Sequence, residues 1–249
     1  MNILILGSGG REHAFAWKLR QSKQCGNLFV APGNAGTDQI AKNIAIDVND
    51  FPKIKEFVLE EDIEMVRTLR SELGDEISIR ADANQAYDLK TALHVVEGMA
   101  PYKLDFLEQP VHMSDMESMV EITRQSPIPI MADEAAKSLD NLAQIAKNRA
   151  ADCVSIYIIG PGGLTVSKKM AAIAEAYRMR AYVGGALESV IGSTAGLHLA
   201  ASSPSIDLGC EMSGQYLLRE DIGMEPIEMV DGALVLTDRP GFGVDLDES

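Results

Sequence analysis

The stretch ISIRADANQ, residues 77–85, reads as a short apolar strand that runs directly into an acidic and an amide side chain. The same order of features recurs in LDFLEQP at 104–110 and in IPIMADE at 128–134. A strand, a turn and one helix together fill an interval of this length, so the repeat predicts successive βα units. The carboxylates that end the three strands lie 26 and 25 residues apart: Asp82, Glu108 and Asp133.

Strand candidates continue at a similar spacing to the end of the chain. Six of them begin near residues 77, 104, 128, 154, 181 and 206. Helix-length segments such as 89–99 and 141–150 lie between them. This alternation indicates a (β/α) barrel rather than a sandwich, although a closed barrel of this kind has eight strands. The sequence therefore predicts an α/β fold with a barrel or a partial barrel of about six strands.

The three carboxylates are candidates for a metal site. Residues at the carboxyl ends of barrel strands project into one mouth, where like charges repel unless a cation offsets them. Carboxylate oxygens are the ligands that Mg²⁺ prefers, so Asp82, Glu108 and Asp133 predict a magnesium site. The alternative is that they are three solvated loop carboxylates.

The first residues, NILILGSGGREHAFAWKL, predict a buried strand, a glycine-rich turn and a helix. Gly7, Gly9 and Gly10 would let backbone N–H groups approach an anion at the positive end of the helix, and Arg11 would add a cation. This pattern predicts a phosphate-binding loop. A tight strand-to-helix turn that binds nothing is the alternative, because a short glycine motif alone has low specificity.

The segment between these two regions holds further strands at 28–31 and 44–47 and a helix at 51–60. The apolar stripe of that helix changes register at the acidic triplet 60–62, which indicates a seam near residue 61. Gly74 is expected to end the helical segment in a left-handed conformation. Residues 76–81 then alternate as a strand.

Composition limits the class of partner. The net charge is −15, and residues 1–60 hold 7 Lys/Arg against 6 Asp/Glu, so the acidity lies in the rest of the chain. Nucleic acid is not expected, because phosphate neutralisation needs clustered basic residues. The three cysteines form no CxxC motif, and no export signal or membrane span is indicated. A cytoplasmic protein without membrane partners is the expectation.

The front segment resembles a known family. GSGGREHAFAWKL, FVAPGNAGT and IDVNDF are together similar to the N-terminal domain of glycinamide ribonucleotide synthetase (phosphoribosylamine–glycine ligase). In that family this domain helps to hold the phosphoribosyl substrate, while ATP binds a separate region. The resemblance implies, at most, a ligase fragment that binds a phosphorylated ligand through Gly7 to Arg11.

The rest of the chain, from about residue 61, resembles a different family. DANQAYD, FLEQP, MADE, GPGGLT and GGALES are similar to the enolase superfamily, in its mandelate racemase and muconate cycloisomerase branch. The resemblance implies that Asp82, Glu108 and Asp133 bind Mg²⁺ and that Asn84 and Gln109 support them. It also implies removal of a proton α to the carboxylate of a small substrate, with the metal stabilising the enediolate.

The base that removes this proton is less well matched. Glu188 corresponds to an acidic position at the barrel mouth, or is simply a carboxylate favoured by a helix N-terminus. Tyr157 stands where the family has a lysine or aspartate, and its reference pKa of about 10 makes it a poor base. Lys53 and Lys55 form the family's KxK pattern by letter only, since they fall on the front helix. The usual lysines are therefore missing, and impaired turnover is expected.

These observations predict a chimera of three parts: a ligase-like βαβ segment at 1–60, a barrel portion at 61–225, and a hairpin with a tail at 226–249. The hairpin turn is expected at Asp231-Gly232. Two front strands are expected to complete the barrel, and any unpaired edges would favour a homo-oligomer. The alternatives to a Mg²⁺-dependent lyase, cycloisomerase or racemase are a scaffold without catalysis and the ligase fragment.

Overall fold

The computed structural model describes residues 2–247. The chain divides into two compact units, Met1–Met65 and Val66–Ser249. The first unit contains β1 (Ile3–Gly7), α1 (Gly10–Arg20), β2 (Leu28–Pro32), a 3₁₀ turn (Thr37–Gln39), β3 (Lys42–Asn43) and the start of α2 (Phe51–Leu73). None of the helices described in residues 2–247 combines the length and the apolar character that a membrane span needs.

The first unit is a three-stranded parallel sheet in the order β1-β2-β3. Its small core consists of Ala16 from α1 and of Leu28 and Val30 from β2. The third strand comes earlier than the predicted 44–47. Ile44 N–H still donates to Val30 O at 2.9 Å, but Ile46 N–H then donates to Ile44 O at 2.7 Å. This tight turn bends the chain away from β2, so pairing stops after Asn43.

The front strands do not complete the barrel. Among the described residues β1, β2 and β3 pair with no strand but one another, and the larger sheet contains β4 to β9 alone. The expectation of eight strands is therefore wrong. The physical reason is that β1 pairs with β2 along five residues, from Ile3↔Leu28 to Gly7↔Pro32. This ladder and the packing of α1 satisfy the front strands within their own sheet.

Helix α2 continues through the acidic triplet 60–62 without a break, so the change in apolar register does not interrupt the backbone. Gly74 ends the helix at φ 72°, as predicted. The predicted strand at 76–81 is wrong over most of its length. Arg70 donates to the carbonyl oxygens of Gly74 and Ile77, both at 2.7 Å. These oxygens therefore bond to a side chain and not to a neighbouring strand. Ladder pairing with β5 (Leu107–Glu108) begins only at Ala81.

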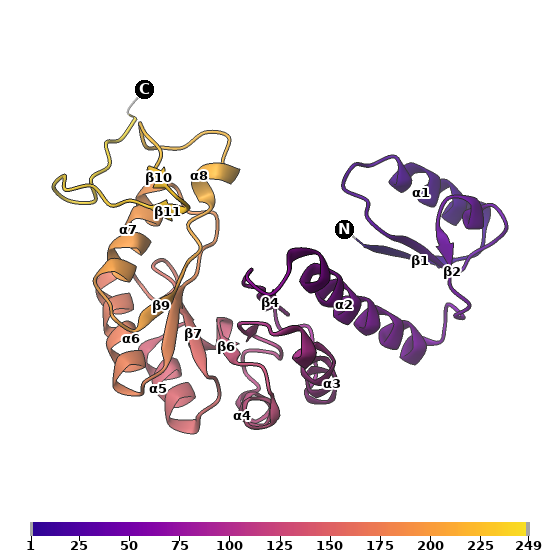
Figure 1. The fold of residues 1–249 in the computed structure, drawn as a ribbon, viewed down its shortest axis with the longest axis horizontal. Helices are drawn as coiled ribbons and strands as arrows, with labels where there is room; N and C mark the ends of the chain where they lie inside the picture. Colours follow the sequence, from indigo (N-terminus) through magenta and orange to yellow (C-terminus); the bar gives the residue numbers. More distant parts are fainter. Residues whose placement is uncertain (1, 248–249) are drawn as a thin grey trace. The chain divides into compact units, whose positions relative to one another are not determined.

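The second unit is a six-stranded parallel sheet in the order β4-β5-β6-β7-β8-β9, with the helices that follow its strands (Figure 1). Its regular elements, beyond the short 3₁₀ turns, are β4 (Ala81–Asp82), α3 (Leu89–Met99), β5 (Leu107–Glu108), α4 (Met116–Gln125), β6 (Ile130–Ala132), α5 (Leu139–Asn148), β7 (Cys153–Ile156), α6 (Leu164–Ala176), β8 (Arg180–Val183), α7 (Val190–Ala201), β9 (Ile206–Cys210), α8 (Gly214–Leu217), β10 (Met229–Val230) and β11 (Ala233–Leu234). All six predicted barrel strands are present in sequence order, although the first is shortened to Ala81–Asp82.

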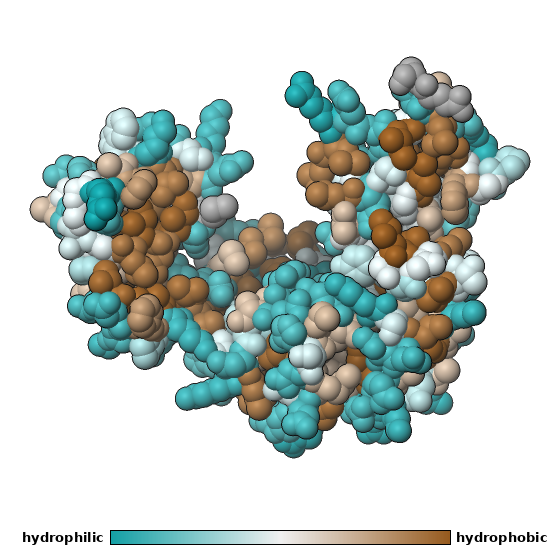
Figure 2. Space-filling view, turned by 180° about the vertical axis from the view of Figure 1, so that it is seen from behind, coloured by the Kyte–Doolittle hydropathy of each residue, from teal (hydrophilic) through white to brown (hydrophobic). Residues whose placement is uncertain are grey.

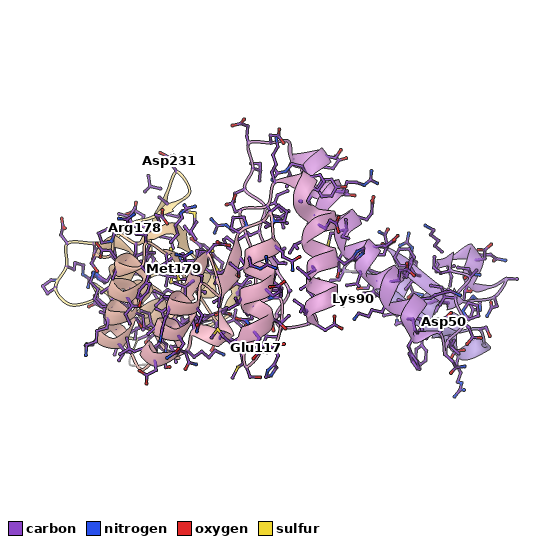
Figure 3. The ribbon with its side chains drawn as sticks, turned by 90° about the horizontal axis from the view of Figure 1, so that it is seen from below. Asp50, Lys90, Glu117, Arg178, Met179 and Asp231 are labelled. Carbon is purple, nitrogen blue, oxygen red and sulfur yellow. The ribbon has the colours of Figure 1, made fainter. Side chains whose placement is uncertain are left out.

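The second unit has an inner core between its strands and an outer layer of helices. Phe106, Met131, Cys153 and Leu208 form a buried cluster from β5, β6, β7 and β9, or from residues beside them. Neighbouring helices α3 and α4, α5 and α6, and α6 and α7 pack side by side (Figure 3). Side chains that alternate along a strand serve both layers, which is why these strands read as continuous apolar runs.

The C-terminal hairpin matches its prediction. β10 and β11 pair antiparallel, with Val230 opposite Ala233. Asp231 at φ 49° and Gly232 at φ 79° form the two central residues of a turn with positive φ at both positions, as a two-residue type I′ loop requires. Figure 2 shows apolar side chains gathered over the C-terminal tail, and the exposed ones include Ile222, Met224 and Leu246.

The N-cap of α3 offers a direct test of local stability. Asp88 precedes the helix, and its carboxylate accepts a hydrogen bond from Thr91 N–H at 2.8 Å. We expect Asp88→Ala to lower the free energy of unfolding by about 1 kcal/mol, because a helix N–H loses its partner. Chemical denaturation measures this change. The control Lys90→Ala, at an exposed position in the same helix, should change stability much less, and equal losses in both variants would contradict the capping role.

Candidate active site

The strand register brings the predicted metal ligands to one end of the sheet. Asp82 is the register partner of Glu108 across β4 and β5. Glu108 in turn pairs with Met131 on β6, and Asp133 directly follows that strand. All three carboxylates line one cavity of about 710 Å³. The intervals of 26 and 25 residues between these carboxylates therefore each correspond to the step from one strand to its neighbour in the sheet.

Burial in the cavity raises the pKa values of two of the predicted ligands. Burial raises the pKa of Glu108 to about 8, and the charges of Asp133 and Asp82 add to the effect. Burial also raises the pKa of Asp133 to about 6, helped by the neighbouring Glu134 and opposed by a hydrogen bond from Tyr157. Glu108 and Asp133 are thus both partly removed from water, and the charge of Asp133 disfavours ionisation of Glu108. Such an arrangement is unfavourable for ionised carboxylates unless a cation is present.

The donor set fits a hard cation in its chemistry. Within the described part of the chain, Asp133 Oδ1 and Glu134 Oε2 are buried and have no hydrogen-bond partner. Buried carboxylate oxygens normally have one, so unpaired oxygens beside a cluster of acids are suited to a metal ion. The distances between these side chains fit a bound metal ion less well than their chemistry does. Among residues 2–247, no three Asp, Glu, His or Cys side chains lie close enough together to hold a metal ion.

The two predicted supporting residues both contact this cluster. Gln109 is fully buried, and its Oε1 accepts hydrogen bonds from the N–H groups of Asp133 at 3.0 Å and Ala135 at 3.1 Å. Its Nε2 donates to Val111 O at 2.9 Å. Asn84 donates from its backbone N–H to Asp82 Oδ1 at 2.8 Å. Gln109 therefore fixes the backbone after β6, and Asn84 fixes the carboxylate at the end of β4.

Tyr157 lies at the same strand ends, one residue beyond β7. Its hydroxyl donates to Asp133 Oδ2 at 3.0 Å. Burial raises the pKa of Tyr157, and the carboxylate of Asp133 raises it further. The perturbation that would make this tyrosine a base is a lowered pKa, so the environment acts in the opposite direction. Tyr157 is a neutral hydrogen-bond donor that orients Asp133.

Glu188 joins the cavity from the loop between β8 and α7. The side chain is buried, with 7% of its surface exposed, and it lines the same cavity as the three acids. Its Oε2 accepts a hydrogen bond from Ala186 N–H at 2.7 Å. Helix α7 begins two residues later, so its N-terminal dipole also favours the carboxylate. The two readings from the sequence, a mouth residue and a helix-start carboxylate, are therefore compatible.

The cavity also contains residues that the sequence motifs did not single out: Arg80, Glu134, Lys137, Tyr182 and Glu211. Two of them carried a recognisable signal. Glu211 directly follows β9, as Asp133 follows β6, and burial raises its pKa. Arg80 lies two residues before Asp82, and alternation along an extended segment places both on one face.

In the first unit, the glycine-rich loop already holds a carboxylate. Gly9 N–H donates to Glu12 Oε2 at 2.8 Å, which satisfies a donor that a phosphate would use. The Asn34 amide donates to Ser8 O at 2.8 Å and so tightens the loop. Arg11 is exposed at the start of α1. Gly7, Gly9, Gly10 and Arg11 thus form the expected strand-to-helix turn, and their binding of phosphate stays a prediction.

Comparison with protein families supports both resemblances. A family model described as "Enolase C-terminal domain-like" matches residues 39–249. A second model, described as "Phosphoribosylglycinamide synthetase, N domain", matches residues 1–70. The two matches overlap at 39–70, which includes nearly all of α2. The two resemblances are confirmed, and the position of the seam near residue 61 stays a prediction.

The relatives that match this chain include muconate and chloromuconate cycloisomerases. The chain is 34% identical over 187 residues to a chloromuconate cycloisomerase of Cupriavidus necator, a match that covers 75% of this chain and 50% of the relative. It is 32% identical over 196 residues to muconate cycloisomerase 1 of Rhodococcus opacus, covering 78% and 52%. The chain therefore spans about half the length of these curated relatives.

Solved structures show the same family. The fold matches muconate lactonizing enzyme from Pseudomonas fluorescens, a structure in complex with muconolactone, with a TM-score of 0.74 and 28% identity. That match covers 99% of this chain and 61% of the other. An N-succinyl Arg/Lys racemase from Bacillus cereus matches with a TM-score of 0.73 and 25% identity, covering 99% and 60%. The strand order, the acidic strand ends and these matches agree: this chain belongs to the enolase C-terminal domain-like family and resembles its muconate and chloromuconate cycloisomerases.

Proposed function

We propose that this chain binds Mg²⁺ at the strand ends and removes a proton α to the carboxylate of a small substrate. The observation that carries the proposal is that Asp82, Glu108 and Asp133, at the ends of three neighbouring strands, line one cavity in which burial raises the pKa of Glu108. Carboxylates gathered at a partly buried site repel one another unless a cation is present. Asp82, Glu108 and Asp133 are the proposed ligands, and when bound the metal would stabilise the negative charge of an enediolate.

The residues around the ligands have distinct tasks in this proposal. Gln109 holds the backbone of Asp133 through its Oε1, and Tyr157 orients the Asp133 carboxylate by donating to Oδ2. Glu188 is the proposed proton acceptor, because its carboxylate lines the cavity and is not one of the three proposed ligands. Its burial excludes much of the water that would otherwise compete for the proton.

The proposal includes slow turnover, because no lysine stands at the positions where the family resemblance implies one, although Lys137 lines the cavity. Lys53 is on α2 and pairs with Asp50 at 2.9 Å. Lys168 is exposed on α6, where its ammonium donates to Ser203 Oγ at 3.0 Å. A scaffold that retains the metal site without turnover is the alternative. The two differ in whether a folded, Mg²⁺-bound chain exchanges a substrate proton with solvent.

Magnesium binding is the first test of the proposal. We expect Asp82→Asn to raise the Kd for Mg²⁺ at least tenfold in calorimetric titrations, since a neutral amide replaces a charged ligand. Asp207→Asn is the matched control, because Asp207 is an exposed carboxylate on β9 that pairs with Arg180. Its Kd should stay within about twofold of the wild-type value. No saturable binding by folded wild-type protein would refute the metal site.

The match of residues 1–70 to a synthetase N domain favours a second candidate, a phosphorylated ligand at the glycine-rich loop. The loop would have to exchange its hydrogen bond from Gly9 to Glu12 for one to the ligand. Titration with ribose 5-phosphate tests this candidate. Saturable binding that weakens in Arg11→Ala would support it, and a flat titration would remove it.

A further inference from the structure

The six-stranded sheet has two outer strands, and one side chain connects them. β4 and β9 stand at the two ends of the strand order in the described part of the chain. Arg80 immediately precedes β4, and its Nη2 donates to Leu208 O on β9 at 2.8 Å. A carbonyl group on the last strand is thus satisfied by a donor from the first. Edge carbonyls need such partners when no further strand covers them.

The guanidinium of Arg80 also lies against two aromatic rings inside the sheet. Its Cζ is 5.1 Å from the ring centroid of Phe106, beside β5, and 5.2 Å from that of Tyr182 on β8. The two rings are themselves 6.3 Å apart at an angle of 57°. Cation–π contacts at these distances hold a guanidinium in place. Arg80 therefore contacts both halves of the curved sheet, in addition to its hydrogen bond to Leu208.

Arg80 and the two rings it contacts lie next to the acidic cluster. Backbone hydrogen bonds extend to the residues before β4, because Asp105 N–H donates to Ile79 O at 2.9 Å. Side chains alternate along such a segment, so Arg80 faces the same side as Asp82. By the same rule Phe106 faces the side of Glu108. Arg80 and Phe106 line the cavity together with these carboxylates.

We infer that Arg80 is a positioning residue that joins the two edges of the open sheet and thereby holds Asp82 in register with the rest of the acidic cluster. The inference rests on the proposed function only in treating these acids as Mg²⁺ ligands. An arginine suits the task because its planar group stacks on rings while its nitrogens donate in the plane. Lysine has a compact ammonium and cannot do both in the same way.

The test compares Arg80→Leu and Arg80→Lys with Arg180→Leu. Arg180 is the matched control, because it also connects a strand to β9: its Nε is 2.9 Å from Asp207 Oδ2, in an exposed pair. Amide hydrogen exchange of residues 78–84 and 206–211 reports on the two edges. Calorimetric titration with Mg²⁺ reports on the acidic cluster, and both measurements use the full chain well below its melting temperature.

We expect Arg80→Leu to speed exchange at both edges at least tenfold and to raise the Kd for Mg²⁺ at least tenfold. Arg80→Lys should lie between Arg80→Leu and wild type, and Arg180→Leu should match wild type in both readouts. Exchange at the edges that is unchanged in Arg80→Leu, or equally fast in Arg180→Leu, would overturn the inference. So would faster edge exchange in Arg80→Leu without any change in the affinity of a Mg²⁺-binding wild type.

The inference can still be tested if wild type does not bind Mg²⁺ or if Arg80→Leu does not fold. If wild type does not bind Mg²⁺, the proposed function fails, whereas edge exchange still decides whether Arg80 joins the strands. If Arg80→Leu does not fold, Arg80→Lys decides by the same criteria. Exchange at wild-type rates in that variant would show that the stacked, forked geometry of arginine is not needed, and would overturn the inference.

Discussion

Asp133→Asn is expected to lower Mg²⁺-dependent exchange of the α-proton of muconolactone with solvent deuterium at least 100-fold. A factor of 100 corresponds to about 2.7 kcal/mol of lost transition-state stabilisation. The substitution is nearly isosteric and leaves an oxygen that can still accept the hydrogen bond from Tyr157. The loss would therefore come from the missing charge at the proposed metal ligand. Deuterium uptake followed by NMR or mass spectrometry measures it.

The control for this experiment is Glu121→Gln, which removes an exposed carboxylate on α4 that pairs with Arg124. Its exchange rate should equal that of wild type. Equal rates in wild type and Asp133→Asn would rule out a role for this carboxylate. A folded wild type that binds Mg²⁺ and exchanges no proton, across a panel of carboxylates, would favour the scaffold over the enzyme.

Glu108→Gln is expected to stabilise the metal-free protein at alkaline pH. Burial and neighbouring acids raise the pKa of Glu108 from 4.5 to about 8 in the folded state. Between these values the folded chain binds more protons than the unfolded chain, so the free energy of unfolding falls as pH rises. The stabilising contribution is complete below about pH 4.5 and lost above about pH 8. Glutamine cannot ionise and removes this dependence.

The expected gain at pH 8.5 is on the order of 3 kcal/mol, a reduced value that takes account of partial exposure to solvent. Urea denaturation in the presence of a chelator measures it, and the gain should disappear near pH 4.5. Glu117→Gln, at a position in the first turn of α4, is the control and should leave the pH dependence of stability unchanged. A pH dependence in Glu108→Gln that is as steep as that of wild type would contradict the assignment of this shift to Glu108.

Added Mg²⁺ extends the same experiment. A bound cation favours the ionised form of a carboxylate, so Mg²⁺ should stabilise wild type at pH 8.5. The Glu108→Gln variant should gain much less, because it lacks one proposed ligand. A gain of equal size in both proteins would separate the stability effect of Glu108 from metal binding.

Local patterns in the sequence were sufficient for most of the second unit. The six strands, the helix at 89–99, the stop at Gly74 and the turn at Asp231-Gly232 are all present. Each depends on an apolar period or on a residue with a special backbone preference, and such signals act over a few residues. The motif spacing also placed the three carboxylates at equivalent strand ends.

The errors occurred where backbone groups found partners that the apolar pattern does not reveal. In the strand predicted at 76–81, the carbonyl oxygen of Ile77 accepts from Arg70, and the strand predicted at 44–47 gave way to a turn after Asn43. The prediction that front strands would complete the barrel failed because those strands pair among themselves. The boundaries predicted at residues 60 and 225 stay predictions, while the compact units divide after Met65.

The sequence by itself determined the family, the order of the strands and the identity of the acidic strand-end residues, because these depend on residue type and spacing along the chain. Only the tertiary structure decided how those residues act on one another. The raised pKa of Glu108, the orientation of Asp133 by Tyr157 and Gln109, and the bridge from Arg80 to Leu208 all join residues from different strands. Such effects depend on burial and on distances of a few ångströms, which the curvature and register of the folded sheet set.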